Sequence, residues 1–167
     1  MLEGRTAQRL DQNLQVMRII HVALAFGVLA FAASSLVNAR GVMKPLVEPI
    51  DWIMAGFGVM TGIAGWIVPR LIPLPRPDHV LDEDNQAALI AGGIQTRMII
   101  GCAMFEGGAF ANLARYFTDQ IALNLAVAII LWLFLLVHHP RRAVLFDQVE
   151  ARLRELREDK QVAAARP

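Results

Sequence analysis

Residues 121–137 read IALNLAVAIILWLFLLV, a run of seventeen residues in which Asn124 is the only polar side chain. Three further apolar runs of 17 to 19 residues occupy 19–37, 52–68 and 98–114. Each is long enough, or nearly so, to cross a hydrocarbon core of ~30 Å as a helix rising ~1.5 Å per residue. Strands of membrane barrels alternate apolar and polar residues, and these runs do not. We therefore predict an all-α integral membrane protein with four transmembrane helices.

The composition of the whole chain supports this prediction. Of its 167 residues, 56% are hydrophobic and only 19% are charged. A soluble domain has about 45–50% apolar and about 25% charged residues. The expected partners are the lipid bilayer and, within it, further copies of the chain or other membrane subunits. No nucleic-acid partner is expected.

Basic residues are distributed unevenly among the segments that join the predicted spans. Of the 16 Lys and Arg residues, 13 precede the first span, lie between the second and third, or follow the last. Only Arg40, Lys44 and Arg115 lie in the other two connections. The positive-inside rule then places both termini and the central connection in the cytoplasm. The expected location is a bacterial inner membrane.

The connections between spans also carry structural signals. The segment from Arg115 to Gln120 has only six residues, which predicts that the third and fourth helices are antiparallel neighbours. Pro69 and the prolines after it end the second helix. Asp82 and the polar residues that follow it predict a helix start that leads into the third span.

The chain divides into a transmembrane domain, residues 1–140, and a charged tail, residues 141–167. Apolar residues recur in the tail at helical spacing among Arg and Glu. They are Leu145, Val149, Leu153 and Leu156. This pattern predicts a cytoplasmic amphipathic helix. It lies on a surface or in solvent, or it docks a soluble partner.

Small residues predict how the second and third spans meet. In the second span they form one helical stripe: Ala55, Gly58, Gly62 and Gly65. Gly101 and Gly108 form a similar face on the third span. Such stripes let two helix backbones approach closely inside a membrane. We therefore expect these two spans to form a tight hairpin.

Glu106 is the one acidic residue inside the predicted spans. It lies nine residues, or ~13 Å of helix, beyond Arg97 and hence near the bilayer midplane. An ionised carboxylate there is costly, so the group is protonated, paired or reached by water. Helix periodicity points it away from Gly101 and Gly108. Thr61 lies at a similar depth and is a candidate hydrogen-bond partner.

Residues 98–107 read MIIGCAMFEG. This segment resembles the carboxylate-bearing helix of the c subunit, the proteolipid of rotary ATP synthases, in which Met-Ile-Ile-Gly precedes the ion-carrying acid. The glycines of the preceding span, Gly56 among them, and a cytoplasmic loop between the two helices are further similarities. The resemblance implies that Glu106 gains and loses a proton or another cation. The loop here is longer and richer in proline than in that family, so the resemblance bears on Glu106 rather than on the whole chain.

Two other functions remain open. In one, the chain is a structural or accessory membrane subunit, and Glu106 forms a packing hydrogen bond. In the other, it is a haem or metal redox protein that uses His21, His138 and His139, which are expected at the cytoplasmic interface. Haem or metal ligation would need partners at matched depth on facing helices, so interfacial histidines are the simpler interpretation and no cofactor is predicted. The sequence has no phosphate loop, catalytic triad or dinucleotide fingerprint, and an enzyme is not favoured.

Overall fold

The computed structural model describes residues 4–38, 44, 48–77 and 81–164, and within these ranges every regular element is a helix. The helices are α1 (Gly4–Asn38), α2 (Pro49–Leu71), α3 (Glu83–Asp119), α4 (Ala122–Val137) and α5 (Arg142–Ala164). The all-α prediction is confirmed. Arg40 and the last three residues of the predicted tail lie outside the described residues.

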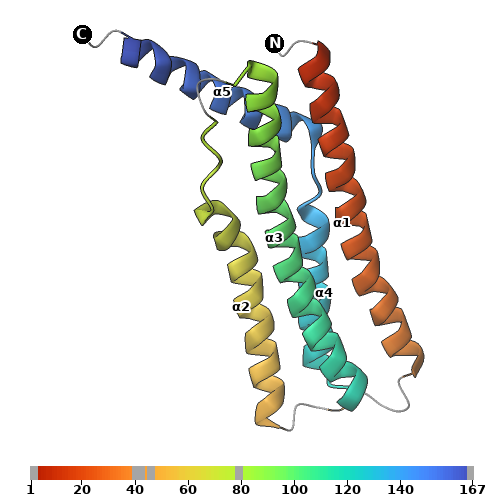
Figure 1. Ribbon diagram of the computed structural model, residues 1–167. Coiled ribbons are helices and arrows are strands. Elements are labelled where there is room, and N and C mark those ends of the chain that lie inside the picture. Colours follow the sequence, from red (N-terminus) through yellow and green to blue (C-terminus); the bar gives the residue numbers. More distant parts are fainter. Residues whose placement is uncertain (1–3, 39–43, 45–47, 78–80, 165–167) are drawn as a thin grey trace.

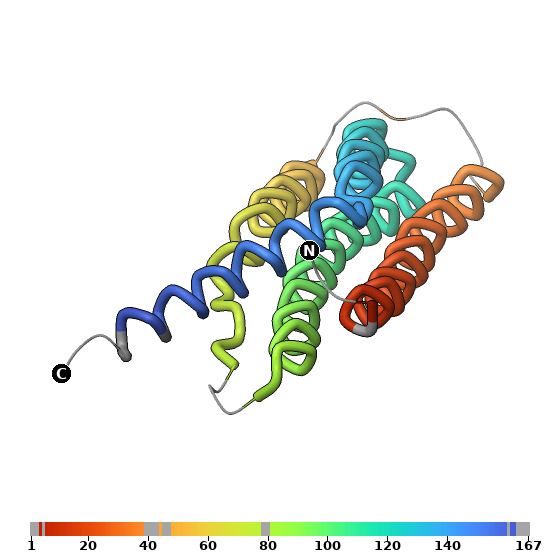
Figure 2. The backbone as a smooth tube through the Cα atoms, turned by 90° about the horizontal axis from the view of Figure 1, so that it is seen from above, coloured from red at the N-terminus to blue at the C-terminus, as the bar shows by residue number. Residues whose placement is uncertain are grey.

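Helix α3 is the centre of a bundle and contacts each of the other four helices. The first four helices run side by side, with α1 and α2 on either side of α3 (Figure 1). Seen along the bundle, α5 crosses over the end at which α1 begins (Figure 2). The α3–α4 connection lies at the opposite end (Figure 1).

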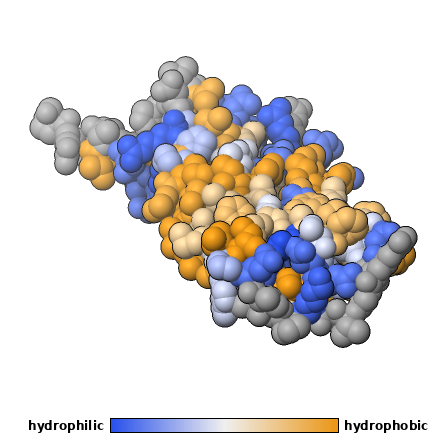
Figure 3. All heavy atoms as spheres, turned by 90° about the horizontal axis from the view of Figure 1, so that it is seen from below, coloured by the Kyte–Doolittle hydropathy of each residue, from blue (hydrophilic) through white to orange (hydrophobic). Residues whose placement is uncertain are grey.

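Three helices, α1, α2 and α3, are long and apolar enough to cross a membrane. The sixteen residues of α4 extend only ~24 Å, and α4 qualifies as a fourth span only together with α5, from which it is bent by 62°. Large apolar side chains are exposed on the flanks, for example Phe26 and Met60, each 66% exposed. Figure 3 shows such apolar surface beside patches of polar side chains at the end where α3 meets α4.

The helix boundaries follow from capping and proline. The Asp82 side chain accepts a hydrogen bond of 2.8 Å from the backbone N–H of Asn85, so the predicted start of α3 is confirmed. From there α3 continues without a break for 37 residues. Pro69 lies in the last turns of α2, and Pro140 separates α4 from α5. Pro140 marks a break because proline cannot donate to a helix backbone, whereas α2 continues two residues beyond Pro69, which was predicted to end it.

The connection between α3 and α4 is shorter than predicted. Arg115 was expected in this connection, but α3 continues through it to Asp119. Gln120 then takes a left-handed conformation, with φ of 59°, and its backbone N–H donates to the Tyr116 carbonyl at 2.7 Å. The two helices are antiparallel neighbours, as predicted (Figure 1).

The apolar stripe of α5 packs inside the chain rather than facing solvent or a partner. Its four residues are buried against a cluster from α1 and α3 that includes Leu10, Leu14 and Ile90. Ion pairs from Arg142 to Asp11, at 2.7 Å, and from Arg157 to Glu83 hold the edges of this contact. The predicted amphipathic helix is therefore present, and its apolar face covers the ends of α1 and α3.

The glycine stripe of α2 faces two helices rather than one. A Cβ atom added to Gly65 would lie 3.2 Å from the Gly101 carbonyl oxygen of α3 and 3.0 Å from the Phe105 ring. One added to Gly62 would instead meet Leu131 of α4 at 3.0 Å. Gly58 faces both helices, because a Cβ atom added to it would lie 2.5 Å from Asn112 of α3 and 2.6 Å from Val127 of α4. The second span therefore packs into the groove between α3 and α4.

Replacing Gly65 by leucine is expected to destabilise the folded protein by about 1–3 kcal/mol, the usual cost of overpacking. Backbone atoms of α3 block the new side chain, so α2 and α3 must separate. Gly56→Leu, on the same helix, is the matched control because no atom lies within 4 Å of its added Cβ. Unfolding by SDS titration in mixed micelles would measure both variants. Equal losses of stability would contradict the packing described.

Candidate functional site

Glu106 lies on the face of α3 that packs against α1. A Cβ atom added to Gly27 of α1 would lie 3.6 Å from the Glu106 Oε1 atom and 3.7 Å from the Phe110 ring. The absence of a side chain at Gly27 therefore leaves space for the carboxyl group. Glu106 is half-buried, and among the described residues it forms no hydrogen bond or ion pair.

Thr61 does not lie beside Glu106. Its hydroxyl donates to the Gly58 carbonyl of its own helix at 2.9 Å, and its side chain faces Gly108. Gly108 and Glu106 are two residues apart on α3, about 200° around the helix at 3.6 residues per turn. The structure therefore does not bring the proposed pair together, because Thr61 and Glu106 lie on opposite sides of α3.

Histidine side chains lie between Glu106 and the end of the bundle that α5 covers. His21 of α1 is 2% exposed, and its Nδ1 atom is 3.8 Å from the Sγ atom of Cys102. Cys102 precedes Glu106 by one turn of α3 and lies on the same face. On its other side, the His21 ring meets the ring of His139 edge-on, with 5.2 Å between centroids. His139 is exposed, so this row of polar groups leads from Glu106 to the surface.

The three predicted histidines do not all meet. His138 turns to the aromatic rings of Phe105 and Trp66, at 4.9 and 5.4 Å between centroids, whereas His139 is the residue that meets His21. In the part of the chain that the structure covers, no three His, Cys, Asp or Glu side chains are grouped as metal ligands. A metal site with three such ligands is therefore not formed among these residues.

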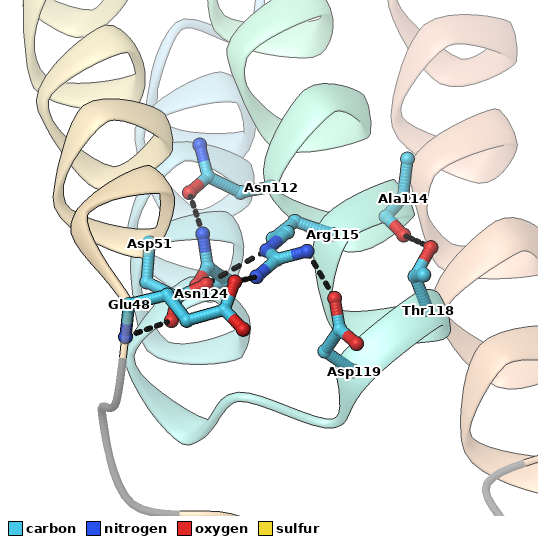
Figure 4. A network of polar contacts seen from close by, with 8 residues as sticks. All are labelled: Glu48, Asp51, Asn112, Ala114, Arg115, Thr118, Asp119 and Asn124. Atoms are coloured by element: carbon cyan, nitrogen blue, oxygen red, sulfur yellow. Dashed lines mark hydrogen bonds and ion pairs between the residues drawn. The ribbon is translucent and has the colours of Figure 1, made fainter.

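A second polar group joins α2 to α3 at the opposite end, and the sequence analysis missed it. Asp51 is 0% exposed, and the Arg115 Nε atom donates to its Oδ1 atom at 2.7 Å (Figure 4). The same guanidinium group pairs with Glu48 at 3.2 Å and with Asp119. The backbone N–H of Glu48 donates to the other Asp51 oxygen at 3.3 Å. One arginine thus fastens the start of α2 to the end of α3.

Two buried asparagines extend this group towards the middle of the bundle. Asn124 of α4 donates to Asn112 of α3 at 3.1 Å (Figure 4). Asn112 in turn donates to the Gly108 carbonyl of its own helix at 2.9 Å. Interhelical amide bonds of this kind hold membrane helices together. The Oδ1 atom of Asn124 has no partner among the described residues. These asparagines lie between α3 and α4, away from the α1 face that carries Glu106.

Comparisons with known proteins do not extend this description. No protein-family model matches the chain, and no curated protein or solved structure matches it either. The likeness of residues 98–107 to the c subunit is therefore a resemblance between short segments. What the chain does has to be inferred from its own residues and their geometry.

Proposed function

We propose that this chain is an integral membrane protein of the cytoplasmic membrane, with four spans, whose Glu106 binds and releases a proton or another small cation. The observation that carries the proposal is the half-buried Glu106 carboxyl group, which has no hydrogen-bond partner among the residues described. Ionisable residues inside a membrane are costly and mark ion pathways and proton relays.

The position of Glu106 along α3 supports this role. Arg97 and Arg115 lie nine residues before and nine residues after it, so each is ~13 Å away along the helix axis. The two arginines are ~27 Å apart, close to the ~30 Å thickness of a hydrocarbon core. If each arginine lies at one membrane surface, Glu106 lies at the midplane.

Polar neighbours provide a route for exchange with water. The row formed by Cys102, His21 and His139 begins one turn from Glu106 and ends at an exposed imidazole. Histidine changes charge near neutral pH and can pass a proton between its two ring nitrogens. In the proposed orientation this row opens to the cytoplasm.

The alternative of a packing hydrogen bond is less well supported. Such a role requires a donor or acceptor for the Glu106 carboxyl group, and the described residues supply none. Gly27, which lies opposite the carboxyl group, has no side chain that could donate a hydrogen bond to it. The resemblance to the c subunit favours a carboxyl group that exchanges a cation.

Labelling with dicyclohexylcarbodiimide tests the proposal, because this reagent attacks protonated carboxyl groups in apolar surroundings. Glu106 is expected to be labelled at low pH and to become unreactive as the pH rises and the carboxyl group ionises. Asp51 is an internal control, since its side chain is fully buried against Arg115 and is expected to stay unreactive. Protection by Na⁺ at constant pH would identify a metal cation rather than a proton as the ligand. Absent labelling, or labelling that ignores both pH and Na⁺, would refute the proposal.

A further inference from the structure

An apolar groove runs along the outside of the bundle between α2 and α4. Its volume is about 440 Å³, and Arg70 is its only charged lining residue. The other lining residues are apolar and come from both helices, among them Gly58, Gly62 and Trp66 of α2 and Val127, Leu131 and Phe134 of α4. The groove extends along α2 from Gly58 to Arg70, about 18 Å, slightly more than one leaflet of a ~30 Å hydrocarbon core.

A basic pocket of about 480 Å³ continues this groove at the end of the bundle that α5 covers. Trp66 and Arg70 line both spaces, so the two adjoin. The charged or titratable side chains that line the pocket are all of the basic type: Arg70, Arg97, Arg141, His138 and His139. No acidic side chain is among its lining residues.

Two of these arginines are free to bind an anion. Arg97 is already engaged, since its guanidinium group donates to the Ile72 carbonyl at 2.7 Å. Arg70 lies over the Trp66 ring, with 4.5 Å between the guanidinium carbon and the ring centroid, and is exposed. Arg141 is exposed as well. Neither Arg70 nor Arg141 pairs with a carboxylate in the described part of the chain.

From these features we propose that the chain binds an anionic phospholipid at this site. One acyl chain lies in the groove between α2 and α4, and the phosphate lies between Arg70 and Arg141. Basic pockets between membrane helices bind anionic lipid head groups, and an apolar groove one leaflet long suits the chain attached to such a head group. The proposal uses a different face of the bundle from Glu106 and does not depend on its role.

Quenching of Trp66 fluorescence by brominated lipids tests this site. In the Trp52→Phe/Trp132→Phe protein, Trp66 is the only tryptophan left. This protein would be placed in phosphatidylcholine vesicles with a small, equal fraction of brominated phosphatidylglycerol or brominated phosphatidylcholine. Two cationic contacts predict enrichment of the anionic lipid beside Trp66 on the order of ten-fold. Quenching should therefore be stronger with brominated phosphatidylglycerol.

The double substitution Arg70→Gln/Arg141→Gln should make the two lipids quench equally. Arg18→Gln/Arg154→Gln is the matched control, because it removes two exposed arginines outside the pocket lining and should keep the preference. A preference that survives the first pair, or disappears with the second, would overturn the proposal. Inorganic phosphate should not relieve the quenching. Relief by phosphate would show that the pocket recognises the phosphate group alone, and it would overturn the proposed role of the apolar groove.

Discussion

Glu106→Gln is expected to abolish proton exchange inside the membrane while leaving the helices folded and inserted. Glutamine keeps the shape of the side chain and some of its hydrogen-bonding capacity, but the amide cannot gain or lose a proton near neutral pH. Infrared difference spectra of the protein in lipid, recorded between low and high pH, should show a protonated carboxyl band that disappears on ionisation. The variant should lose the part of this band that Glu106 contributes, while the bands of the other carboxyl groups remain.

A second substitution separates this chemistry from a role in packing. If the carboxyl group only joined helices, Glu106→Ala would lower stability by roughly 0.6 to 2 kcal/mol, the range for interhelical hydrogen bonds in membranes. Glu106→Gln would then preserve both activity and stability. An unchanged carboxyl band or full activity in the Gln variant would sink the cation-exchange proposal, even if the carbodiimide label attaches.

Asp51→Ala is expected to cause the largest loss of stability of any substitution considered. Removing one partner of a buried ion pair typically costs about 3–5 kcal/mol, and the lower end of this range is expected because Arg115 keeps its pairs with Glu48 and Asp119. Asp51 is fully buried and fixes the start of α2 against the end of α3. SDS titration would measure the change in unfolding free energy, and thermal denaturation should follow it.

Asp119→Ala is the matched control for Asp51, since Asp119 pairs with the same arginine one turn away on α3. Its side chain is 33% exposed, so solvent screens the pair and the expected loss is no more than ~0.5 kcal/mol. Equal effects of the two aspartate substitutions would show that burial does not determine the strength of this contact.

The fold was predictable because the apolar runs leave few alternatives. Segments 19–37, 52–68 and 98–114 lie entirely within helices of the structure, and 121–137 differs from α4 only at Ile121, the residue before it. The extent of α3 was not predictable from hydropathy. A charged residue such as Arg115 ends an apolar run in the sequence. It does not end the helix, because the Arg115 side chain forms ion pairs with three carboxylates.

The candidate site was predictable only in part. Glu106 stands out because no other acid interrupts a predicted span, and helix periodicity correctly separates its face from the glycines of α3. Asp51 was missed because it lies one residue outside its apolar run, where charged residues are ordinary. A usable signal existed, since Asp51 and Arg115 have opposite charges and were predicted on the same side of the membrane. The position of Thr61 depends on how α2 is rotated, which only packing against α3 and α4 determines.

The contact between α5 and the start of α1 imposes an order on the assembly of the protein. Leu10 and Leu14 are synthesised more than a hundred residues before their partners on α5, such as Val149. Contacts between segments so distant in sequence form late because the intervening chain must first be ordered. Until α5 has been synthesised, the apolar surface at this end of α1 and α3 has no cover. The nascent chain must therefore be protected there by lipid, by a chaperone or by the membrane-insertion machinery until α5 emerges.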